Sequence, residues 1–307
     1  MATLASSADV FALPTRALIG RSRDCDLVLP ARDVSSRHAT LEWNGADWQL
    51  RDLGSRNGTW LEGQRLVGDA RPVVCAGARL RFGHDSEWVL EDASPPELMA
   101  RSLTDGAWRL AQGGYLALPS ADAPERCVYR DRQGRWVVSG DEGDAQAIDD
   151  RELLVMADAS AWRVHLPGAD ASTWQEDPAG RSLARLRLQL AYSRDEEYVE
   201  AVALCGDERL DLKARAHHYT LLILARRRLA DRAAGVAEAE EGWIRQDELG
   251  DMLRMSDNHL YITIHRARAQ LGELGVADAA GLVERRPGTR QLRLGVADLE
   301  LIMLNPR

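Results

Sequence analysis

Short segments in which apolar and polar residues alternate recur through residues 1–93. Examples are residues 37–43 and 48–52, and Asn-Gly and Gly-Ser pairs separate such segments. A period of two is typical of strands with one buried face, so this part of the chain is predicted to form an all-β sandwich. Two adjacent prolines lie in the segment 94–97 that follows, and they indicate a domain boundary.

The alternation resumes over residues 98–168, where we expect a small acidic β-rich domain. Its predicted strands are 108–110, 115–118, 127–129, 136–138 and 162–166. Residues 169–183 are polar and rich in turn-forming residues. They are predicted to be a linker.

From residue 184 onward, some segments have the strand period of two and others have the helical period of about 3.6 residues. Strand-like segments come first, three helical patterns follow, and two short strands close the region; these lie at 184–192, 198–205, about 213–232, 245–254, 257–274, 282–285 and 291–294. The last helix places Leu260, Ile264, Ala267 and Leu271 at spacings that bring them to one apolar face. Strands, three helices and a hairpin predict an α+β winged helix-turn-helix domain over 184–307. The expected fold class is therefore multidomain.

Composition and charge narrow the function classes. The 307 residues carry a net charge of −9, and residues 184–307 hold nearly equal numbers of acidic and basic side chains, so no segment is a strongly basic nucleic-acid domain. No apolar run approaches the roughly 18 residues of a membrane helix, and the first residues do not resemble a secretory signal. We expect a cytoplasmic protein with no membrane partner.

Four scattered cysteines indicate neither a disulfide framework nor a zinc site. The sequence also lacks the phosphate-binding loop, the zinc-protease motif and the nucleophile elbow. We therefore expect no enzyme activity, no metal and no cofactor.

Three motifs occur in order in the first domain, and Arg81-Phe82-Gly83 follows them; the three are Gly20-Arg21, Ser35-Ser36-Arg37-His38 and Gly54-Ser55-Arg56-Asn57-Gly58-Thr59. In combination they resemble the forkhead-associated (FHA) family over roughly residues 13–91. The resemblance implies a β-sandwich whose loops bind phosphothreonine on a partner protein. A phosphothreonine dianion needs several directed hydrogen-bond donors and no catalyst, which loops on a rigid sandwich supply.

The resemblance also implies roles for single residues. Arg21 would hold the phosphopeptide main chain near the phosphate, Ser35 would donate to the phosphate, and Asn57 would bind the peptide backbone through its amide. Ser36, Arg37 and Arg56 are further candidates for phosphopeptide contacts, whereas Gly20, His38 and Gly58 would order the loops. The chain departs from the family pattern at Ser36, where arginine is frequent, and at Glu62, where asparagine is common.

The last part of the chain resembles the winged-helix effector domain of OmpR/PhoB-type response regulators. The segment 260–271 is similar to the recognition helix, and 282–295 is similar to the wing. If the apolar face of this helix meets the core, its other side chains lie wholly or partly outside the core and are candidate DNA contacts. The candidates on the helix are Thr263, His265, Arg266 and Arg268, and those on the wing are Arg286 and Arg290. The segment from Arg254 to Arg293 contains seven arginines and four acidic residues. The candidate DNA-binding surface therefore has a modest positive charge, referred to below as the positive footprint.

The sequence thus predicts a signalling protein whose FHA module binds a phosphothreonine-containing partner, a Ser/Thr protein kinase or its substrate. Its winged helix would bind double-stranded DNA and regulate transcription. The alternative is an adaptor whose winged helix contacts protein and not DNA. The oligomeric state stays open.

Overall fold

Residues 1–131, 133–140, 145–168, 181–276, 278–286 and 288–304 are described by a computed structural model. The chain divides into two units. The N-terminal unit comprises Met1–Leu110, Asp150–Leu154 and Arg163–Thr173, and the C-terminal unit comprises Ala111–Asp149, Val155–Trp162 and Trp174–Arg307. Most of the predicted linker, residues 169–180, lies outside the described residues. Among the helices that the described residues form, none is long and apolar enough to cross a membrane.

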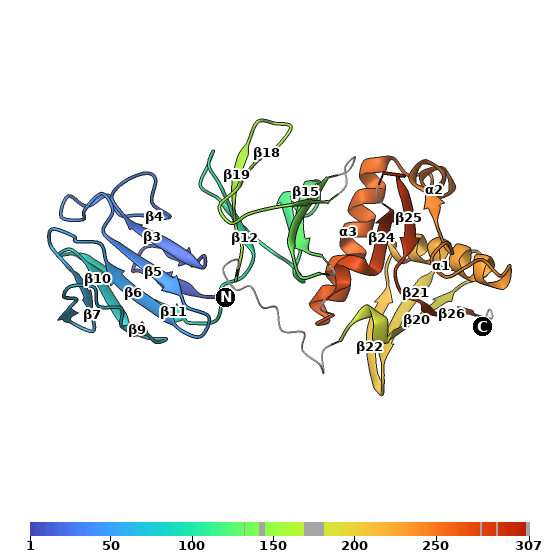
Figure 1. The fold of residues 1–307 in the computed structure, drawn as a ribbon, viewed down its shortest axis with the longest axis horizontal. Helices are drawn as coiled ribbons and strands as arrows, with labels where there is room; N and C mark the ends of the chain where they lie inside the picture. Colours follow the sequence, from blue (N-terminus) through green and yellow to red (C-terminus); the bar gives the residue numbers. More distant parts are fainter. Residues whose placement is uncertain (132, 141–144, 169–180, 277, 287, 305–307) are drawn as a thin grey trace. The chain divides into compact units, whose positions relative to one another are not determined.

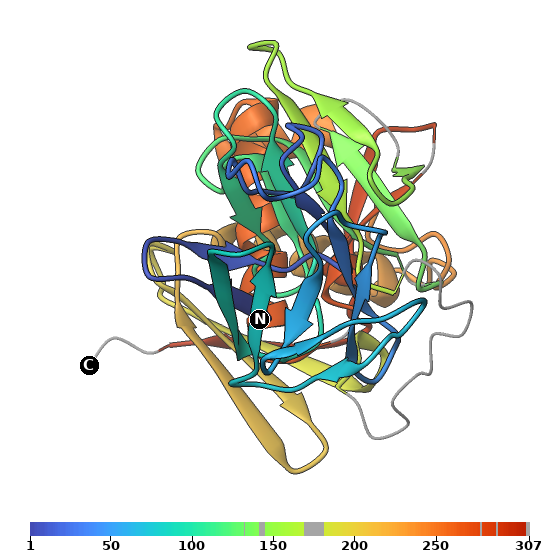
Figure 2. The same ribbon diagram turned by 90° about the vertical axis from the view of Figure 1, so that its left-hand side faces the viewer.

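The first 92 residues form the predicted β-sandwich (Figures 1 and 2). One sheet has six strands in the order β2 (Val10–Ala12), β1 (Thr3–Ala5), β11 (Ser86–Asp92), β10 (Arg79–Phe82), β7 (Thr59–Leu61) and β8 (Gln64–Arg65). The other has five, in the order β4 (Leu27–Val28), β3 (Arg16–Gly20), β5 (Ala39–Trp43), β6 (Trp48–Asp52) and β9 (Val73–Val74).

Alternation of side chains builds the core between these sheets. Ile19 on β3, Leu41 on β5 and Leu50 on β6 are fully buried, and so are Leu80 and Leu90 on the facing sheet. Because successive strand residues point to opposite faces, the polar residues between them reach solvent. The sandwich is thereby a rigid platform for the loops at its ends.

A third sheet belongs mostly to the same N-terminal unit. Its order is β13 (Trp108–Leu110), β12 (Met99–Ser102), β19 (Ala161–His165) and β18 (Leu153–Val155). The carboxylate of Asp26 is buried and accepts hydrogen bonds from the Leu18 amide at 2.9 Å and from the Arg151 guanidinium at 3.0 Å. Arg101 donates to the Asp26 carbonyl at 2.6 Å. These bonds join this sheet to the loop that follows β3.

The remaining strands of the predicted 98–168 domain lie in the C-terminal unit, so the two units share that segment. They form a four-stranded sheet in the order β14 (Leu116–Pro119), β15 (Pro124–Arg130), β16 (Trp136–Gly140) and β17 (Gln146–Ala147). Neighbouring strands are antiparallel throughout.

The C-terminal unit also contains three helices and two further sheets. The larger sheet is ordered β22 (Glu208–Ala214), β21 (Val199–Cys205), β20 (Leu186–Tyr192) and β26 (Asp298–Met303), with β26 parallel to β20. The smaller one is ordered β23 (Ile244–Arg245), β25 (Gln291–Leu294) and β24 (Val283–Arg286). The helices are α1 (His218–Ala233), α2 (Gln246–Leu253) and α3 (Asp257–Glu273).

Two predictions for this region can be compared directly with the elements. The helix expected from about residue 213 begins only at His218, because residues 208–214 pair with β21 as a strand. The apolar face expected on α3 is confirmed, since Leu260, Ile264 and Leu271 are all buried in the core. Ser256 caps α3, accepting a hydrogen bond from the His259 amide at 3.3 Å.

Candidate functional site

Two loops of the sandwich run side by side at one end. The first follows β3, and the second leads into β5. Their backbones are joined by hydrogen bonds from the Arg21 amide to the Ser35 carbonyl at 2.9 Å and from the Ser22 amide to the Ser36 carbonyl at 3.0 Å. The Arg21 side chain also donates to the Val34 carbonyl at 3.3 Å. These bonds place Arg21 next to the loop that carries Ser35.

The third loop, between β6 and β7, joins them through side chains. The amide of Arg56 donates to Ser35 Oγ at 3.1 Å, and Asn57 Nδ2 donates to the Asp33 carbonyl at 2.7 Å. Within the described residues the Ser35 hydroxyl donates to no acceptor, so its proton is available to a ligand. The structure thus brings together Arg21, Ser35, Arg56 and Asn57, which are far apart in the sequence.

His38 lies beneath these loops and is completely buried. Its Nδ1 accepts from the Ser35 amide at 3.1 Å, and its Nε2 lies 3.0 Å from the Gly58 carbonyl. The Nε2–H tautomer satisfies both bonds. Burial lowers the pKa of His38, which keeps the ring neutral. This is the geometry that a loop-ordering role requires, and it holds both ring nitrogens inside the protein.

Two glycines allow the loops to approach. A side chain at Gly20 would place its Cβ 2.5 Å from the Ser36 carbonyl oxygen, far inside van der Waals contact. Gly58 has a φ of +88°, which other residues adopt with strain, and a Cβ there would meet the Arg65 side chain. Both positions therefore require glycine.

Two acidic residues that the sequence analysis did not single out organise the site. Asp52 accepts four hydrogen bonds, from the amides of Gly54 and Ser55 at 2.9 Å each, from Ser55 Oγ at 2.6 Å and from Thr59 Oγ1 at 2.5 Å. Although burial alone would raise its pKa, bonds from Ser55 and Thr59 hold the pKa of Asp52 below the ordinary value. An aspartate two residues before Gly-Ser is a known turn signal and would have identified this residue.

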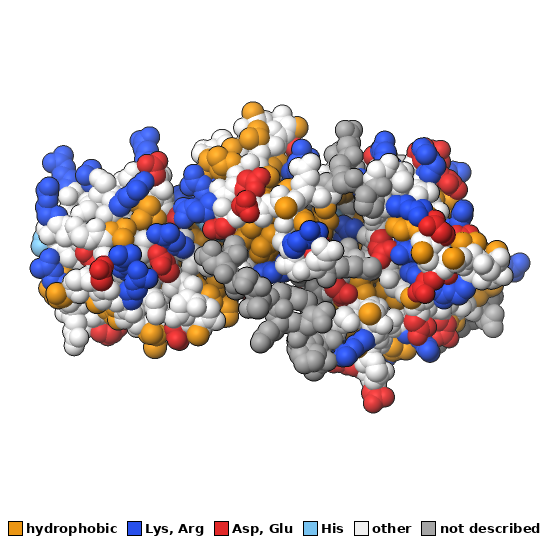
Figure 3. Space-filling view, in the orientation of Figure 1, with side chains coloured by type: hydrophobic (Ala, Val, Ile, Leu, Met, Phe, Trp, Pro, Cys, Tyr) orange, Lys and Arg blue, Asp and Glu red, His pale blue; other side chains and the backbone are white. Residues whose placement is uncertain are grey.

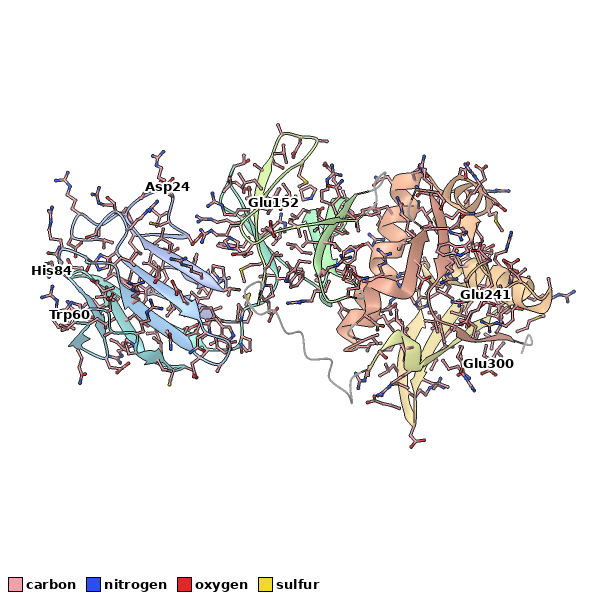
Figure 4. The ribbon with its side chains drawn as sticks, viewed as in Figure 1. Asp24, Trp60, His84, Glu152, Glu241 and Glu300 are labelled. Atoms are coloured by element: carbon pink, nitrogen blue, oxygen red, sulfur yellow. The ribbon has the colours of Figure 1, made fainter. Side chains whose placement is uncertain are left out.

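Asp33 is the second organiser. Its carbonyl accepts from Asn57, and its carboxylate accepts from the His84 amide at 2.6 Å. That bond lowers the pKa of the Asp33 carboxyl. Through Asp33 the turn between β10 and β11 is tied to the loops that carry Ser35 and Asn57. Figure 4 labels Asp24 and His84, which mark the loop after β3 and this turn.

The charge at this end of the sandwich is positive and uncompensated. Five arginines are exposed on the three loops: Arg21, Arg23, Arg32, Arg37 and Arg56. In the described part of the chain, none of the five lies within ion-pair distance of a carboxylate. Blue side chains gather at the left and upper edges of the sandwich in Figure 3. Ser36 and Arg37 are exposed in the second loop, as a ligand contact requires. Such a cluster attracts anions.

The candidate DNA contacts on α3 are placed differently from the prediction. The expectation that they face outward is wrong for Thr263 and His265, which are only 5% and 4% exposed. For His265 the reason is that α3 packs against the β14–β17 sheet (Figure 1), whereas the Thr263 hydroxyl donates to Met255 Sδ, between α2 and α3, at 3.8 Å. Cys127 Sγ lies 3.4 Å from His265 Nδ1, and the Tyr261 hydroxyl donates to the Ser139 carbonyl at 3.1 Å.

The candidate arginines of this region are engaged inside the C-terminal unit. Arg266 is exposed and lies 3.4 Å from Asp122, Arg286 pairs with Glu240 at 2.5 Å, and Arg290 pairs with Asp257 at 2.8 Å. Arg268 donates to the Val283 carbonyl and lies over the Tyr129 ring. The positive footprint that the sequence indicated is therefore largely neutralised, in contrast to the arginines of the sandwich loops.

Residues 17–83 match the family model of the FHA domain. FhaB of Mycobacterium tuberculosis, an FHA domain-containing protein, is 42% identical over 66 residues, which are 22% of this chain and 41% of FhaB. FhaB of Mycolicibacterium smegmatis is also 42% identical over 66 residues. The chain thus spans less than half the length of these curated relatives.

Solved structures are also similar to part of the chain. One, from a structural and functional analysis of phosphothreonine-dependent FHA domain interactions, is 29% identical with a TM-score of 0.27 and covers 30% of this chain and 95% of that chain. Another, Mycobacterium tuberculosis EmbR in complex with a low-affinity phosphopeptide, is 27% identical with a TM-score of 0.28 and covers 30% of this chain and 24% of that chain.

The N-terminal β-sandwich, whose three loops are joined by hydrogen bonds, thus contains an FHA domain at residues 17–83.

Proposed function

We propose that this chain is a signalling protein whose FHA domain binds a phosphothreonine-containing partner, a Ser/Thr protein kinase or its substrate. Binding and not catalysis is its task. The observation that carries the proposal is the cluster around Ser35, where a hydroxyl with an available proton lies among exposed arginines without carboxylate partners. A phosphate dianion would supply the missing counter-charge.

Each group has a distinct part in this proposal. Ser35 Oγ–H and the Arg21 guanidinium donate to the phosphate or to the main chain beside it, and Arg37 and Arg56 add positive charge. Asn57 already donates to the Asp33 carbonyl, so its Oδ1 is the atom left to accept from the peptide backbone. His38, Asp33 and Asp52 act by holding these groups in place.

The test is fluorescence anisotropy with a degenerate phosphothreonine peptide library, beside its unphosphorylated and phosphoserine counterparts. We expect phosphothreonine-selective binding that Arg21→Ala and Ser35→Ala each weaken about tenfold or more, because a charge-assisted hydrogen bond contributes roughly 1.5–3 kcal/mol. Arg71→Ala is the matched control, since Arg71 is exposed on the same domain outside the three loops. Equal binding of phosphorylated and unphosphorylated peptides would contradict the proposal.

For the C-terminal unit we propose two candidate functions, DNA binding and protein binding. The order of β20–β22, α1, α2, α3 and the β24–β25 hairpin supports a winged helix, and with it DNA binding and transcriptional regulation. The ion pairs of Arg286 and Arg290, and the cover on α3, favour the adaptor, in which this unit contacts protein. DNA binding through α3 would require the β14–β17 sheet to move.

Retention on duplex DNA at moderate salt separates the two functions. A DNA-binding protein would be retained, and Arg266→Ala would weaken the retention and reduce its salt dependence. Arg227→Ala, on the exposed surface of α1, is the control. The adaptor predicts no retention by either protein.

A further inference from the structure

The C-terminal unit contains a pocket of about 590 Å³. Its walls come from β15, β16, α3 and the β24–β25 hairpin. Three aromatic side chains line it, namely Tyr129, Tyr261 and Trp243. Its volume falls within the range of roughly 300–1,000 Å³ that small-molecule sites occupy.

Arg268 reaches this pocket with a charge that the protein does not balance. Among the described residues, its buried Nε has no hydrogen-bond partner, and its guanidinium donates to the Val283 carbonyl. Within the described residues no carboxylate lies within ion-pair distance of Arg268. A buried charge without a counter-ion is costly, and proteins rarely retain one unless a ligand or partner compensates it.

Two neighbouring arginines that line the pocket do not share this property, and a third, Arg285, donates to Gln246 Oε1 at 2.8 Å. Arg286 pairs with Glu240 at 2.5 Å, and Arg293 pairs with Glu284 at 2.5 Å. Both guanidinium groups also lie over the Trp243 ring. These two ion pairs are neutral as a whole, so neither supplies a counter-ion for Arg268.

Ser139 is a second donor without a partner. It is 9% exposed, it lines the same pocket, and its hydroxyl makes no hydrogen bond in the described part of the molecule. Buried polar groups are normally satisfied, and two unsatisfied donors at one pocket point to a missing acceptor. One acceptor group bound in the pocket would give both Arg268 and Ser139 the hydrogen-bond partner that they lack.

We infer that this pocket binds a small aromatic anion, a planar ring that carries a carboxylate or a phosphate. The ring lies among Tyr129, Tyr261 and Trp243, and its anionic group accepts hydrogen bonds from Arg268 and Ser139. Stacking on aromatic side chains and a single charge-assisted contact set the orientation. The site is separate from the phosphothreonine site, and its ligand is independent of that proposal.

The same surface of α3 is the one that DNA would need, but the pocket favours a small ligand. The β14–β17 sheet covers the middle of α3, where Cys127 meets His265 and Tyr261 meets Ser139. A duplex is too wide to enter beneath this sheet, whereas a single ring with one charged group fits the volume.

Isothermal titration calorimetry on the full chain tests the inference. The probes are salicylate and adenosine monophosphate, with inorganic phosphate, benzyl alcohol and a DNA duplex as comparisons. We expect saturable binding of at least one aromatic anion, weaker binding of phosphate and of benzyl alcohol, and at least about a tenfold loss in Arg268→Met. Preference for salicylate assigns a carboxylate ligand, and preference for adenosine monophosphate assigns a nucleotide.

Arg209→Met is the matched control, because Arg209 is exposed on β22 of the same unit and does not line the pocket. Ser139→Ala gives a second test if Arg268→Met does not fold, as judged by circular dichroism. The inference is overturned if neither aromatic anion binds saturably, if inorganic phosphate binds as well as both, or if the variants bind like wild type. Duplex binding that depends on Arg268 without small-anion binding would also overturn it.

Discussion

The substitution Asp52→Asn examines how the Arg56–Asn57 loop is held. In the wild type one carboxylate oxygen accepts the amides of Gly54 and Ser55, and the other accepts the hydroxyls of Ser55 and Thr59. An asparagine side chain has only one acceptor oxygen, and it must serve the two amides. Its NH₂ group then faces the hydroxyls, which have to turn around and accept.

The magnitude follows from the change of acceptor. Hydrogen bonds to a charged group contribute roughly 1.5–3 kcal/mol each and neutral ones about 1 kcal/mol. Asp52 is half-buried, so solvent screens part of this difference. We expect the loop to lose about 2 kcal/mol of local stability, which corresponds to a roughly thirtyfold larger equilibrium population of the opened loop. Phosphopeptide binding should weaken with it, because an opened loop has to be ordered again on binding.

Native-state hydrogen exchange of the peptide that spans residues 53–58 measures this opening. Asp47→Asn is the control, since Asp47 is exposed in the turn between β5 and β6. The lowered pKa of Asp52 means that its stabilisation is complete above the unfolded-state pKa and disappears as the pH falls through the folded-state pKa. Asn lacks this acid dependence. Loop amides that exchange in Asp52→Asn at the wild-type rate would refute the reasoning.

Three further outcomes follow. Arg151→Ala leaves the buried Asp26 carboxylate without its counter-ion and should destabilise the N-terminal unit by about 2–3 kcal/mol in hydrogen exchange, with Asp26→Asn in the same chain recovering part of the loss. Gly20→Ala pushes the Ser36 carbonyl away and should weaken phosphopeptide binding about tenfold in anisotropy, while wild-type affinity would contradict the close approach. Burial lowers the pKa of His265 from 6.5 to about 4, so the unfolded state binds protons first and stability should fall as the pH drops between these values; urea denaturation at pH 7 and pH 5 should show a smaller drop for His265→Gln.

Sequence pattern alone predicted much of the fold. The sandwich strands have a strict alternation and turn residues between them, and the face of α3 toward its own core follows from helical spacing. Strand β26 was missed because its pairing partner lies far away in the sequence, whereas β22 pairs with the adjacent β21 and its last residues were assigned to the helix that follows. Gln189 on β20 contacts Glu300 on β26 from 111 positions away, and no local window contains that pairing.

For the site, motif order identified Arg21, Ser35 and Asn57, but it gave no reason for the acids that hold them. Asp33 and Asp52 accept hydrogen bonds from backbone amides and, for Asp52, also from the hydroxyls of Ser55 and Thr59. Apart from a turn preference, these contacts have no sequence signature. Thr263 and His265 were assigned to solvent because helical spacing places them off the apolar face of α3. The sheet that buries His265 comes from residues 116–147, and only tertiary packing connects it to α3.

The parallel pairing of β26 with β20 has a consequence for biosynthesis. All three helices and the β24–β25 hairpin lie between these two strands in the sequence. A ribosome therefore releases the helices before the sheet beneath them gains its last strand, so the completed C-terminal unit forms only after Met303 has emerged. The sandwich closes much earlier, because its β1 and β11 strands are both available once Asp92 is free. Vectorial synthesis would thus let the phosphate-reading loops form while the rest of the chain is still being made.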